Sequence, residues 1–104
     1  MAKIKLRPSA HADLKGIASH TQDKWGRRQR DAYLGKLNER LRRLAENPQI
    51  GLVRDDVRHG YRSAKAGRHL IFYRDIDGGI EVVRILHENM DVKRHLEGRR
   101  AKER

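Results

Sequence analysis

The stretch GRHLIFYRDIDGGIEVVRILH, from Gly67 to His87, holds two apolar runs that are separated by a short glycine turn. The first run predicts a β-strand from Arg68 to Asp75, and the second predicts a strand from Ile80 to His87. Because the Asp77-Gly78-Gly79 turn is so short, the two strands are expected to be antiparallel neighbours. A further strand, predicted from Tyr61 to Ala66, joins them through a turn at Gly67.

Both strands of this stretch carry apolar side chains on both of their faces. In the first strand, Leu70 and Phe72 point to one face, whereas Ile71 and Tyr73 point to the other. Alternation along the second strand predicts two apolar sets on opposite faces: Ile80, Val82 and Leu86 against Val83 and Ile85. Strands of this kind have to be covered on both faces.

The residues before this stretch predict one strand and two helices. Lys3 to Arg7 alternates apolar and basic side chains, which is typical of a half-buried strand. A helix is expected from about Pro8 to Trp25 and a second one from Arg27 to Asn47, separated by the single residue Gly26. So short a break predicts an antiparallel helical hairpin, with Trp25 buried in the core at its elbow.

Together these elements predict an α+β fold for one domain at residues 1–97. The N-terminal strand and the antiparallel helical hairpin are expected to pack on a small, mainly antiparallel sheet of about four strands. A short C-terminal helix or turn is expected at Met90–Leu96. Residues 50–60 are expected to form a loop, and residues 98–104 a basic, mobile tail.

The hairpin can cover only one face of the predicted sheet. We therefore expect the second face to be left open by the hairpin, and to be filled by the C-terminal segment, a dimer mate or an amphipathic element of a partner. The alternative is that the 50–60 loop and the tail cover this face unaided. The two hypotheses differ in whether the isolated chain exposes an apolar, positively rimmed sheet surface.

The composition favours an acidic partner. The chain has 25 Lys and Arg against 14 Asp and Glu, a net charge of +11 over 104 residues. Such a field attracts nucleic acid, anionic lipid or acidic protein. Leu, Ile, Val and Phe together make up only 23 residues, which is close to the composition of disordered chains. An acidic protein that also covers apolar surface would stabilise the fold through binding, so we expect a hetero-oligomer.

Several classes of protein and site are disfavoured. No apolar run is long enough to span a membrane, and Met1 to Ala10 lacks the apolar centre of a signal peptide, so we expect a cytoplasmic protein. The absence of cysteine excludes disulfides and thiolate metal sites. No two of the six histidines have the helical ligand spacing of four residues, and no phosphate-loop motif occurs. We therefore expect no metal and no cofactor.

One group of basic side chains has the residue types of a catalytic site. It lies on or at the ends of adjacent predicted strands: Lys65, Arg68, Arg84 and His87. Arginines can clamp a phosphodiester and a histidine can act as general acid or base, so the set fits metal-independent RNA cleavage. The alternative is that the arginines bind carboxylates and that His87 only ends a strand. The acidic Glu88 beside His87 favours that alternative.

The helix arginines form a separate basic group. No aromatic side chains are interleaved with them, as a stacking platform for single strands would require. Direct nucleic-acid binding therefore rests on charge alone.

The chain contains a set of short motifs that extends to Leu96: Ala12-Asp13-Leu14, Trp25-Gly26, Leu44 to Pro48, Gly60-Tyr61-Arg62, Ile71 to Arg74, Val83 to His87, Met90-Asp91 and His95-Leu96. In this combination they resemble the ParE family of bacterial toxins, which belongs to the RelE/ParE superfamily. The resemblance covers nearly the whole chain.

This resemblance implies a toxin that is encoded beside an antitoxin and folds as a helical hairpin on a small antiparallel sheet. ParE-like members poison DNA gyrase by trapping its DNA-cleavage complex and are not enzymes. Their ParD-like antitoxin wraps an extended, partly helical segment around the toxin. The ending Arg84-Ile85-Leu86-His87 is typical of ParE-like members, so we expect no catalytic residue.

The RNA-cleaving branch of the superfamily, which resembles RelE, gives the alternative. It implies a ribosome-dependent messenger endoribonuclease that uses the basic group defined above: Lys65, Arg68, Arg84 and His87.

The resemblance also implies two sets of contact residues. The last strand and the segment after it are expected to bind the target: Arg84, His87, Met90, Lys93 and Arg94. The open sheet face and its rim are expected to bind the antitoxin: Arg58, Tyr61, Arg62, Arg68, Phe72 and Tyr73.

Overall fold

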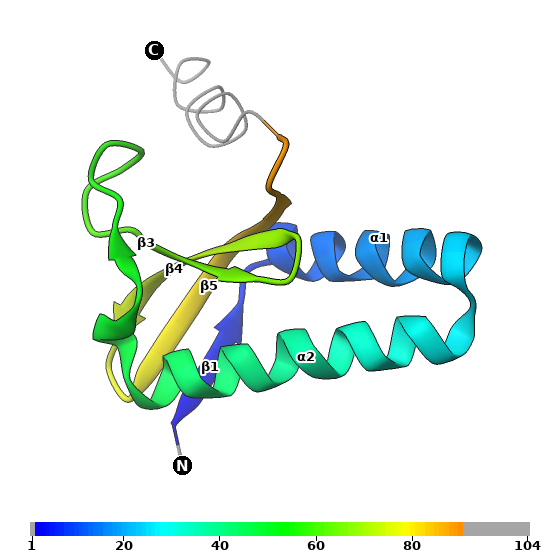
Figure 1. Ribbon diagram of the computed structural model, residues 1–104. Coiled ribbons are helices and arrows are strands. Elements are labelled where there is room, and N and C mark those ends of the chain that lie inside the picture. The colour runs from blue at the N-terminus through cyan, green and yellow to red at the C-terminus, as the bar shows by residue number, and fades with distance from the viewer. Residues whose placement is uncertain (1, 91–104) are drawn as a thin grey trace.

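The computed structural model describes residues 2–90, which form a helical hairpin packed on one face of a five-stranded sheet (Figure 1). In chain order the elements are β1 (Lys3–Leu6), α1 (Pro8–Trp25), α2 (Arg27–Glu46), the 3₁₀ turn η1 (Pro48–Ile50), β2 (Leu52–Val53), β3 (Arg62–Ala66), β4 (His69–Ile76) and β5 (Gly79–His87). The strands lie in the order β1-β5-β4-β3-β2. β1 runs parallel to β5, and the other neighbours are antiparallel. The predicted α+β class is confirmed.

The helical hairpin forms where the sequence predicts it. Pro8 occupies the first turn of α1, where its missing N–H leaves no hydrogen bond unmade. Gly26 separates the two helices with a φ of 93°, a backbone conformation that other residues rarely adopt. The expected ends of both helices agree with the structure to within a residue.

The sheet has one strand more than the predicted four. Leu52 and Val53 of β2 pair with Ser63 and Arg62 of β3, although these residues were expected in a loop. A strand of two residues is too short for a period of two to show in the sequence.

β5 departs from strict alternation at a β-bulge. Val83 has no partner in the pairing with β4, because its neighbours Val82 and Arg84 pair with consecutive residues of that strand. A bulge exchanges the faces of the residues that follow it. Ile85 therefore lies with Val82 on the face toward the helices, whereas Val83 lies in a separate cluster. The predicted grouping of Ile85 with Val83 is wrong for this reason.

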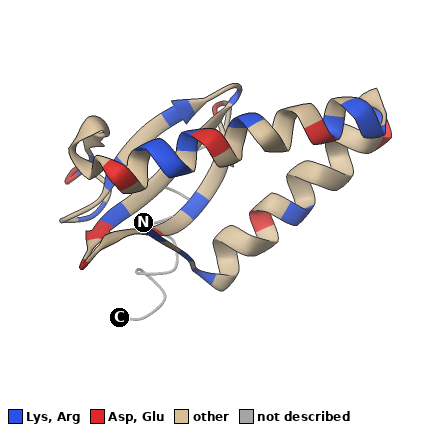
Figure 2. Ribbon diagram, turned by 90° about the horizontal axis from the view of Figure 1, so that it is seen from below, with Lys and Arg blue, Asp and Glu red and all other residues tan. Residues whose placement is uncertain are grey.

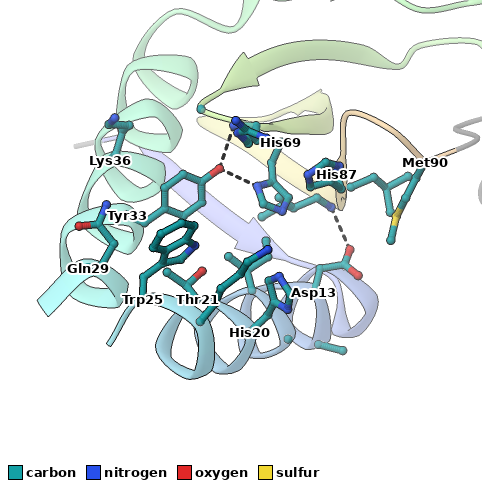
Figure 3. A pocket seen from close by; sticks show the side chains of 18 residues that line it. Asp13, His20, Thr21, Trp25, Gln29, Tyr33, Lys36, His69, His87 and Met90 are labelled. Carbon is teal, nitrogen blue, oxygen red and sulfur yellow. Dashed lines mark hydrogen bonds between the residues drawn. The ribbon is translucent and has the colours of Figure 1, made fainter. Parts of the chain in front are cut away.

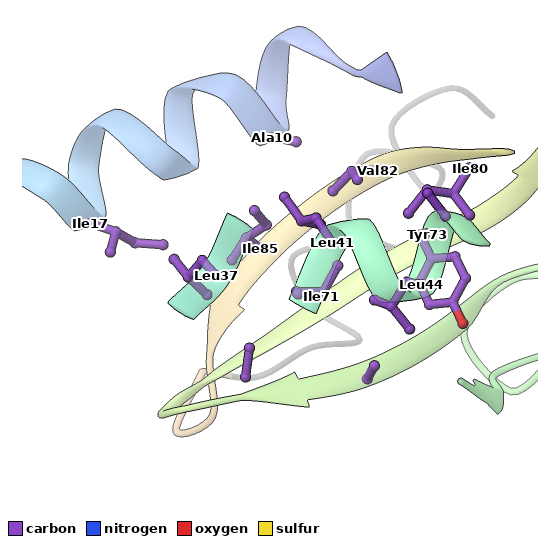
Figure 4. Packing of buried hydrophobic residues seen from close by; sticks show 13 residues of the cluster. Ala10, Ile17, Leu37, Leu41, Leu44, Ile71, Tyr73, Ile80, Val82 and Ile85 are labelled. Carbon is purple, nitrogen blue, oxygen red and sulfur yellow. The ribbon is translucent and has the colours of Figure 1, made fainter. Parts of the chain in front are cut away.

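The main core lies between the hairpin and the sheet (Figure 4). Its largest fully buried side chains come from α2, β4 and β5: Leu37, Leu44, Ile71, Tyr73, Ile80 and Val82. The Tyr73 hydroxyl donates a hydrogen bond to the Pro48 carbonyl at 2.7 Å and accepts one from the Gly51 amide at 2.9 Å. Burial raises the pKa of Tyr73, so the phenol stays protonated and fixes the turn after α2.

The opposite face of the sheet is covered at its centre by the chain itself. Phe72 is 0% exposed and Val83 is 4% exposed. Val57 and Tyr61, from the segment between β2 and β3, form a cluster with Val83. The Arg54 guanidinium lies 5.4 Å from the centroid of the Phe72 ring, a cation–π contact. The expectation of a vacant apolar face is therefore wrong here. The alternative is that the 50–60 loop and the tail cover this face: the loop supplies Arg54 and Val57, and the tail lies outside the described residues.

Trp25 is not a core residue, contrary to the prediction. Its side chain is 67% exposed. The elbow of the hairpin projects beyond the sheet (Figure 1), so the last turn of α1 has no strand to pack against.

The expected C-terminal helix or turn beyond Met90 and the basic tail at 98–104 lie outside the described residues. Within 2–90, neither helix has an apolar stretch of the length that a membrane crossing requires.

Gly79 is the closest approach of the two parallel strands. A β-carbon at this position would lie 1.9 Å from the Lys3 carbonyl oxygen, where only a shift of backbone could relieve the clash. The Lys3 amide donates to the Gly78 carbonyl at 2.8 Å, so β1 is held against this turn.

Replacing Gly79 by alanine is expected to lower the free energy of unfolding by about 2 kcal/mol, because β1 has to move away from β5. Urea unfolding followed by circular dichroism measures this change. The control is Gly35→Ala on α2, where a β-carbon meets nothing within 4 Å. That variant should gain up to about 1 kcal/mol from helix propensity. Equal stability of the Gly79→Ala variant and the unchanged chain would contradict the close packing of β1 on β5.

Candidate functional site

An open pocket of about 870 Å³ lies between the helical hairpin and the ends of β4 and β5 (Figure 3). α1 contributes Asp13 and His20 to its wall, and Trp25 stands at the end of the same helix. α2 contributes Tyr33, and the strands contribute His69 and His87. The pocket therefore joins three separate parts of the sequence.

Asp13 attaches α1 to the free edge of β5. Pairing with β1 ends at Val82, so within the described residues 2–90 the rest of β5 has no neighbouring strand on that side. The Asp13 carboxylate accepts a hydrogen bond from the Ile85 amide at 2.9 Å. It also accepts two hydrogen bonds from the Arg84 guanidinium, at 2.8 and 2.9 Å. Ser9 adds a hydroxyl hydrogen bond to the Val83 carbonyl at 2.9 Å.

The Asp13–Arg84 pair is shielded from solvent. The side chains are 14% and 24% exposed. The hydrogen bonds to Asp13 raise the pKa of Arg84, and two of the guanidinium's donors, on Nε and Nη2, are directed at the carboxylate. Arg84 thus holds β5 against α1 through two of its five N–H donors.

Tyr33 closes the turn between β3 and β4. Its hydroxyl accepts a hydrogen bond from the Arg68 amide at 3.0 Å and lies 2.6 Å from His69 Nδ1. Gly67, in this turn, has a φ of 58°, and a β-carbon there would lie 2.7 Å from the Tyr33 ring. Tyr33 therefore fixes both the turn and the His69 ring.

His69 and His87 form an imidazole pair across β4 and β5. The two residues face each other in the strand register, and their rings meet edge to face with centroids 5.3 Å apart. Burial lowers the pKa of His69, and the neighbouring His87 lowers it further. His69 is therefore a neutral, fixed hydrogen-bonding group at neutral pH.

Comparison with known proteins identifies the family of this chain. The family model described as ParE toxin of type II toxin-antitoxin system, parDE, matches residues 4–92. The chain belongs to the ParE toxin family. A ParE1 toxin of Mycobacterium tuberculosis is 47% identical over 96 residues, which cover 91% of this chain and 98% of that protein. A ParE1 toxin of Caulobacter vibrioides is 33% identical over 96 residues, covering 92% and 99%.

Solved structures show the same fold. A chain of the chromosomal ParDE toxin–antitoxin system from P. aeruginosa superimposes with a TM-score of 0.71 at 21% identity, covering 84% of this chain and 96% of that one. A chain of the YoeB-YefM complex from Staphylococcus aureus gives a TM-score of 0.56 at 19% identity, covering 84% and 97%. The ParE resemblance recognised in the sequence is confirmed.

The basic group that the ribonuclease alternative would use lies at one end of the sheet, but two of its cations are paired with carboxylates. Arg84 is bound to Asp13. The Lys65 ammonium lies 3.2 Å from the Glu88 carboxylate. Arg68 is exposed at the turn, and His87 is half-buried and accepts a hydrogen bond from the Asn89 amide at 3.1 Å. Arg84 binds a carboxylate, as the alternative for this group predicts.

The expected target-binding residues fall into three classes. Arg84 is paired with Asp13, and its side chain is 24% exposed. His87 lines the pocket, and Met90 is 45% exposed at its rim. Lys93 and Arg94 lie outside the described residues.

The expected antitoxin-binding residues are divided between surface and interior. Phe72 and Tyr73 are fully buried and Tyr61 is 6% exposed, so the assignment of these three side chains to an open face is wrong. The Arg54 guanidinium lies against the Phe72 ring. Tyr73 belongs to the main core under the hairpin, and Tyr61 packs with Val57 and Val83. The three cations of the expected set are exposed or half-buried: Arg58, Arg62 and Arg68.

Positive charge is spread over both helices and the sheet, with carboxylates between the cations (Figure 2). On α2, Arg30 pairs with Asp31 at 2.8 Å and Arg42 with Glu39 at 2.8 Å. These exposed pairs contribute little to stability, and they neutralise part of the helix arginines.

Three residues of the site were missed as functional candidates. Asp13 belongs to a quoted motif, but its partner on β5 is remote in sequence. Tyr33 and His69 are joined only by the fold. In the sequence, Gly67 indicates a turn next to His69. It does not show that the Tyr33 side chain packs against that turn.

Replacing Asp13 by asparagine is expected to lower the free energy of unfolding by about 2 kcal/mol, because the shielded Arg84 loses its counter-charge. The matched control is Asp31→Asn, whose exposed pair with Arg30 should be worth less than about 0.5 kcal/mol. Urea unfolding of both variants tests this difference. Equal effects of the two substitutions would show that Asp13 is no more than a surface acid.

His69 is expected to make stability depend on pH. Its pKa is lowered in the fold, so below the ordinary histidine pKa of about 6.5 the unfolded chain takes up a proton more readily. The free energy of unfolding should therefore fall as pH drops from about 7.5 to about 5.5. His69→Gln should reduce that fall, measured by urea midpoints at both pH values. His59→Gln, at a side chain 97% exposed, is the control and should leave the fall unchanged. An identical pH profile for His69→Gln and the unchanged chain would contradict this role.

Proposed function

We propose that this ParE family toxin inhibits DNA gyrase by binding it as a protein and trapping its DNA-cleavage complex. In this proposal the toxin is not an enzyme, acts in the cytoplasm, and is neutralised by an acidic, ParD-like antitoxin in a toxin–antitoxin hetero-oligomer. Family membership supports it, since the ParE model matches residues 4–92.

The observation that carries the non-enzymatic assignment is the pairing of Arg84. A ribonuclease needs free cations to bind the scissile phosphate and to stabilise the charge that develops on it. Here the Arg84 guanidinium makes two hydrogen bonds to Asp13, and Lys65 lies 3.2 Å from Glu88. Moving either cation to a phosphate would leave a carboxylate without its partner.

One observation favours the alternative, a ribosome-dependent messenger endoribonuclease. Two imidazoles, His69 and His87, meet at the pocket with centroids 5.3 Å apart, and a tyrosine hydroxyl is bonded to the first. Such groups can transfer protons. The gyrase proposal requires no proton transfer, so the two functions are distinguished by which activity the chain shows, inhibition of supercoiling or cleavage of transcripts.

The proposed gyrase contact is the rim at the end of β5. We assign to it His87, the exposed Met90 and the following Lys93 and Arg94. The proposed antitoxin contact is a basic surface that includes Arg58, Arg62 and Arg68. A net charge of +11 supports an acidic antitoxin, because opposite potentials speed association and select the partner.

Purified toxin is expected to inhibit supercoiling of relaxed plasmid by gyrase and to increase cleaved DNA, with messenger transcripts intact in cells that express it. Met90→Glu should weaken inhibition at least about tenfold, because it places a charge in the proposed contact. Leu52→Glu is the matched control: Leu52 is 72% exposed on the remote edge strand β2, and its variant should inhibit normally. Plasmid supercoiling gels and transcript blots provide the two measurements.

Two outcomes would overturn the proposal. One is intact supercoiling together with rapid transcript cleavage that His87→Ala abolishes, which would establish the ribonuclease. The other is equal loss of gyrase inhibition in the Met90→Glu and Leu52→Glu variants, which would place the contact elsewhere on the chain.

A further inference from the structure

The outer half of the pocket contains an aromatic face that the proposed function does not use. Trp25 is 67% exposed and lines the pocket from the end of α1 (Figure 3). The Lys24 ammonium lies 5.8 Å from the centroid of the Trp25 ring. An exposed indole beside a cation is a platform on which a planar ring can stack.

The cations of the pocket wall have no carboxylate partners among residues 2–90. Lys36 comes from α2 and Arg68 from the turn before β4, and neither side chain takes part in an ion pair within that range. They contrast with Arg30, Arg42 and Arg84, which are all paired.

Among residues 2–90, the pocket lining has one acidic side chain, Asp13, and that carboxylate is paired with Arg84. It accepts hydrogen bonds from Arg84 and from the Ile85 amide. Lys24, Lys36 and Arg68 therefore give the pocket a positive potential, which favours an anion.

Neutral hydrogen-bonding groups also line the same pocket. His69 is held by the Tyr33 hydroxyl at 2.6 Å, and Gln29 and Thr21 face the pocket from the two helices (Figure 3). A volume of about 870 Å³ is in the range of small-molecule sites. The pocket thus offers a stacking face, cations and fixed polar groups to one ligand.

We propose that this pocket binds a nucleotide, with the base stacked on Trp25 and the phosphate held by Lys36 and Arg68. The nucleotide is either free or part of a single strand of nucleic acid, since the chemistry of base and phosphate is the same in both. An acidic peptide without aromatic residues would satisfy the cations but has no planar ring for the exposed indole. The inference does not depend on the gyrase proposal.

The test uses Trp25 itself, because it is the only tryptophan in the chain. The full-length protein is titrated with ADP and, separately, with an eight-nucleotide single-stranded oligonucleotide, while tryptophan fluorescence is followed. Saturable quenching is expected. Lys36→Gln and Arg68→Gln should each raise the Kd about tenfold, because each removes a charge-assisted hydrogen bond to phosphate.

The control is Lys5→Gln on β1. It removes the same charge from an exposed side chain outside the pocket and should leave the Kd within about twofold. Trp25→Leu, measured by titration calorimetry, should weaken binding at least about fivefold through the loss of stacking. Circular dichroism checks that each variant is folded.

The results of these titrations distinguish a free nucleotide, a nucleic-acid strand and a peptide as the ligand of the pocket. Quenching by ADP supports a free nucleotide, and quenching by the oligonucleotide alone supports a nucleic-acid strand. Quenching by neither ligand overturns the proposal, as does an equal loss of affinity in Lys5→Gln and Lys36→Gln, which would show non-specific attraction. Quenching by an acidic octapeptide with no response to ADP or the oligonucleotide also overturns it and assigns the pocket to a peptide.

Discussion

The carboxylate of Asp13 at the free edge of β5 is the contact on which this structure depends. β1 pairs with β5 only as far as Val82, so the rest of that edge needs other partners. Asp13 supplies one to the Ile85 amide and holds the Arg84 guanidinium in the same place. This single side chain joins α1 to the sheet, neutralises an arginine and forms the inner wall of the pocket.

The division between paired and unpaired cations connects the fold with the proposed function. Arg84 and Lys65, which the ribonuclease alternative would use on a phosphate, are paired with carboxylates. Lys36 and Arg68 face an open pocket without such partners within residues 2–90. A strongly basic chain can thus pair some cations of its sheet with carboxylates and keep others unpaired, within residues 2–90, beside a pocket between its hairpin and its sheet.

The sequence predicted those features that depend on local periodicity. The helices, the break at Gly26 and the three long strands follow from apolar spacing and glycine turns. The bulge at Val83 was not predictable, because two adjacent valines fit either face of a strand. The covering of Phe72 by Arg54 and the ion pair of Asp13 with Arg84 arise from tertiary contacts between remote residues, for which the sequence carries no periodic signal. Trp25 was misplaced because helical spacing does not show where the sheet ends.

Hydrogen exchange of the Ile85 amide, followed residue by residue with NMR, tests the central claim most directly. This amide has no strand partner on the α1 side, and its protection depends on the Asp13 carboxylate. The account predicts exchange as slow as that of the amides bonded within the β4–β5 ladder. Exchange at the rate of an exposed amide, with the ladder still protected, would show that Asp13 does not hold this edge and would free Arg84 for other partners.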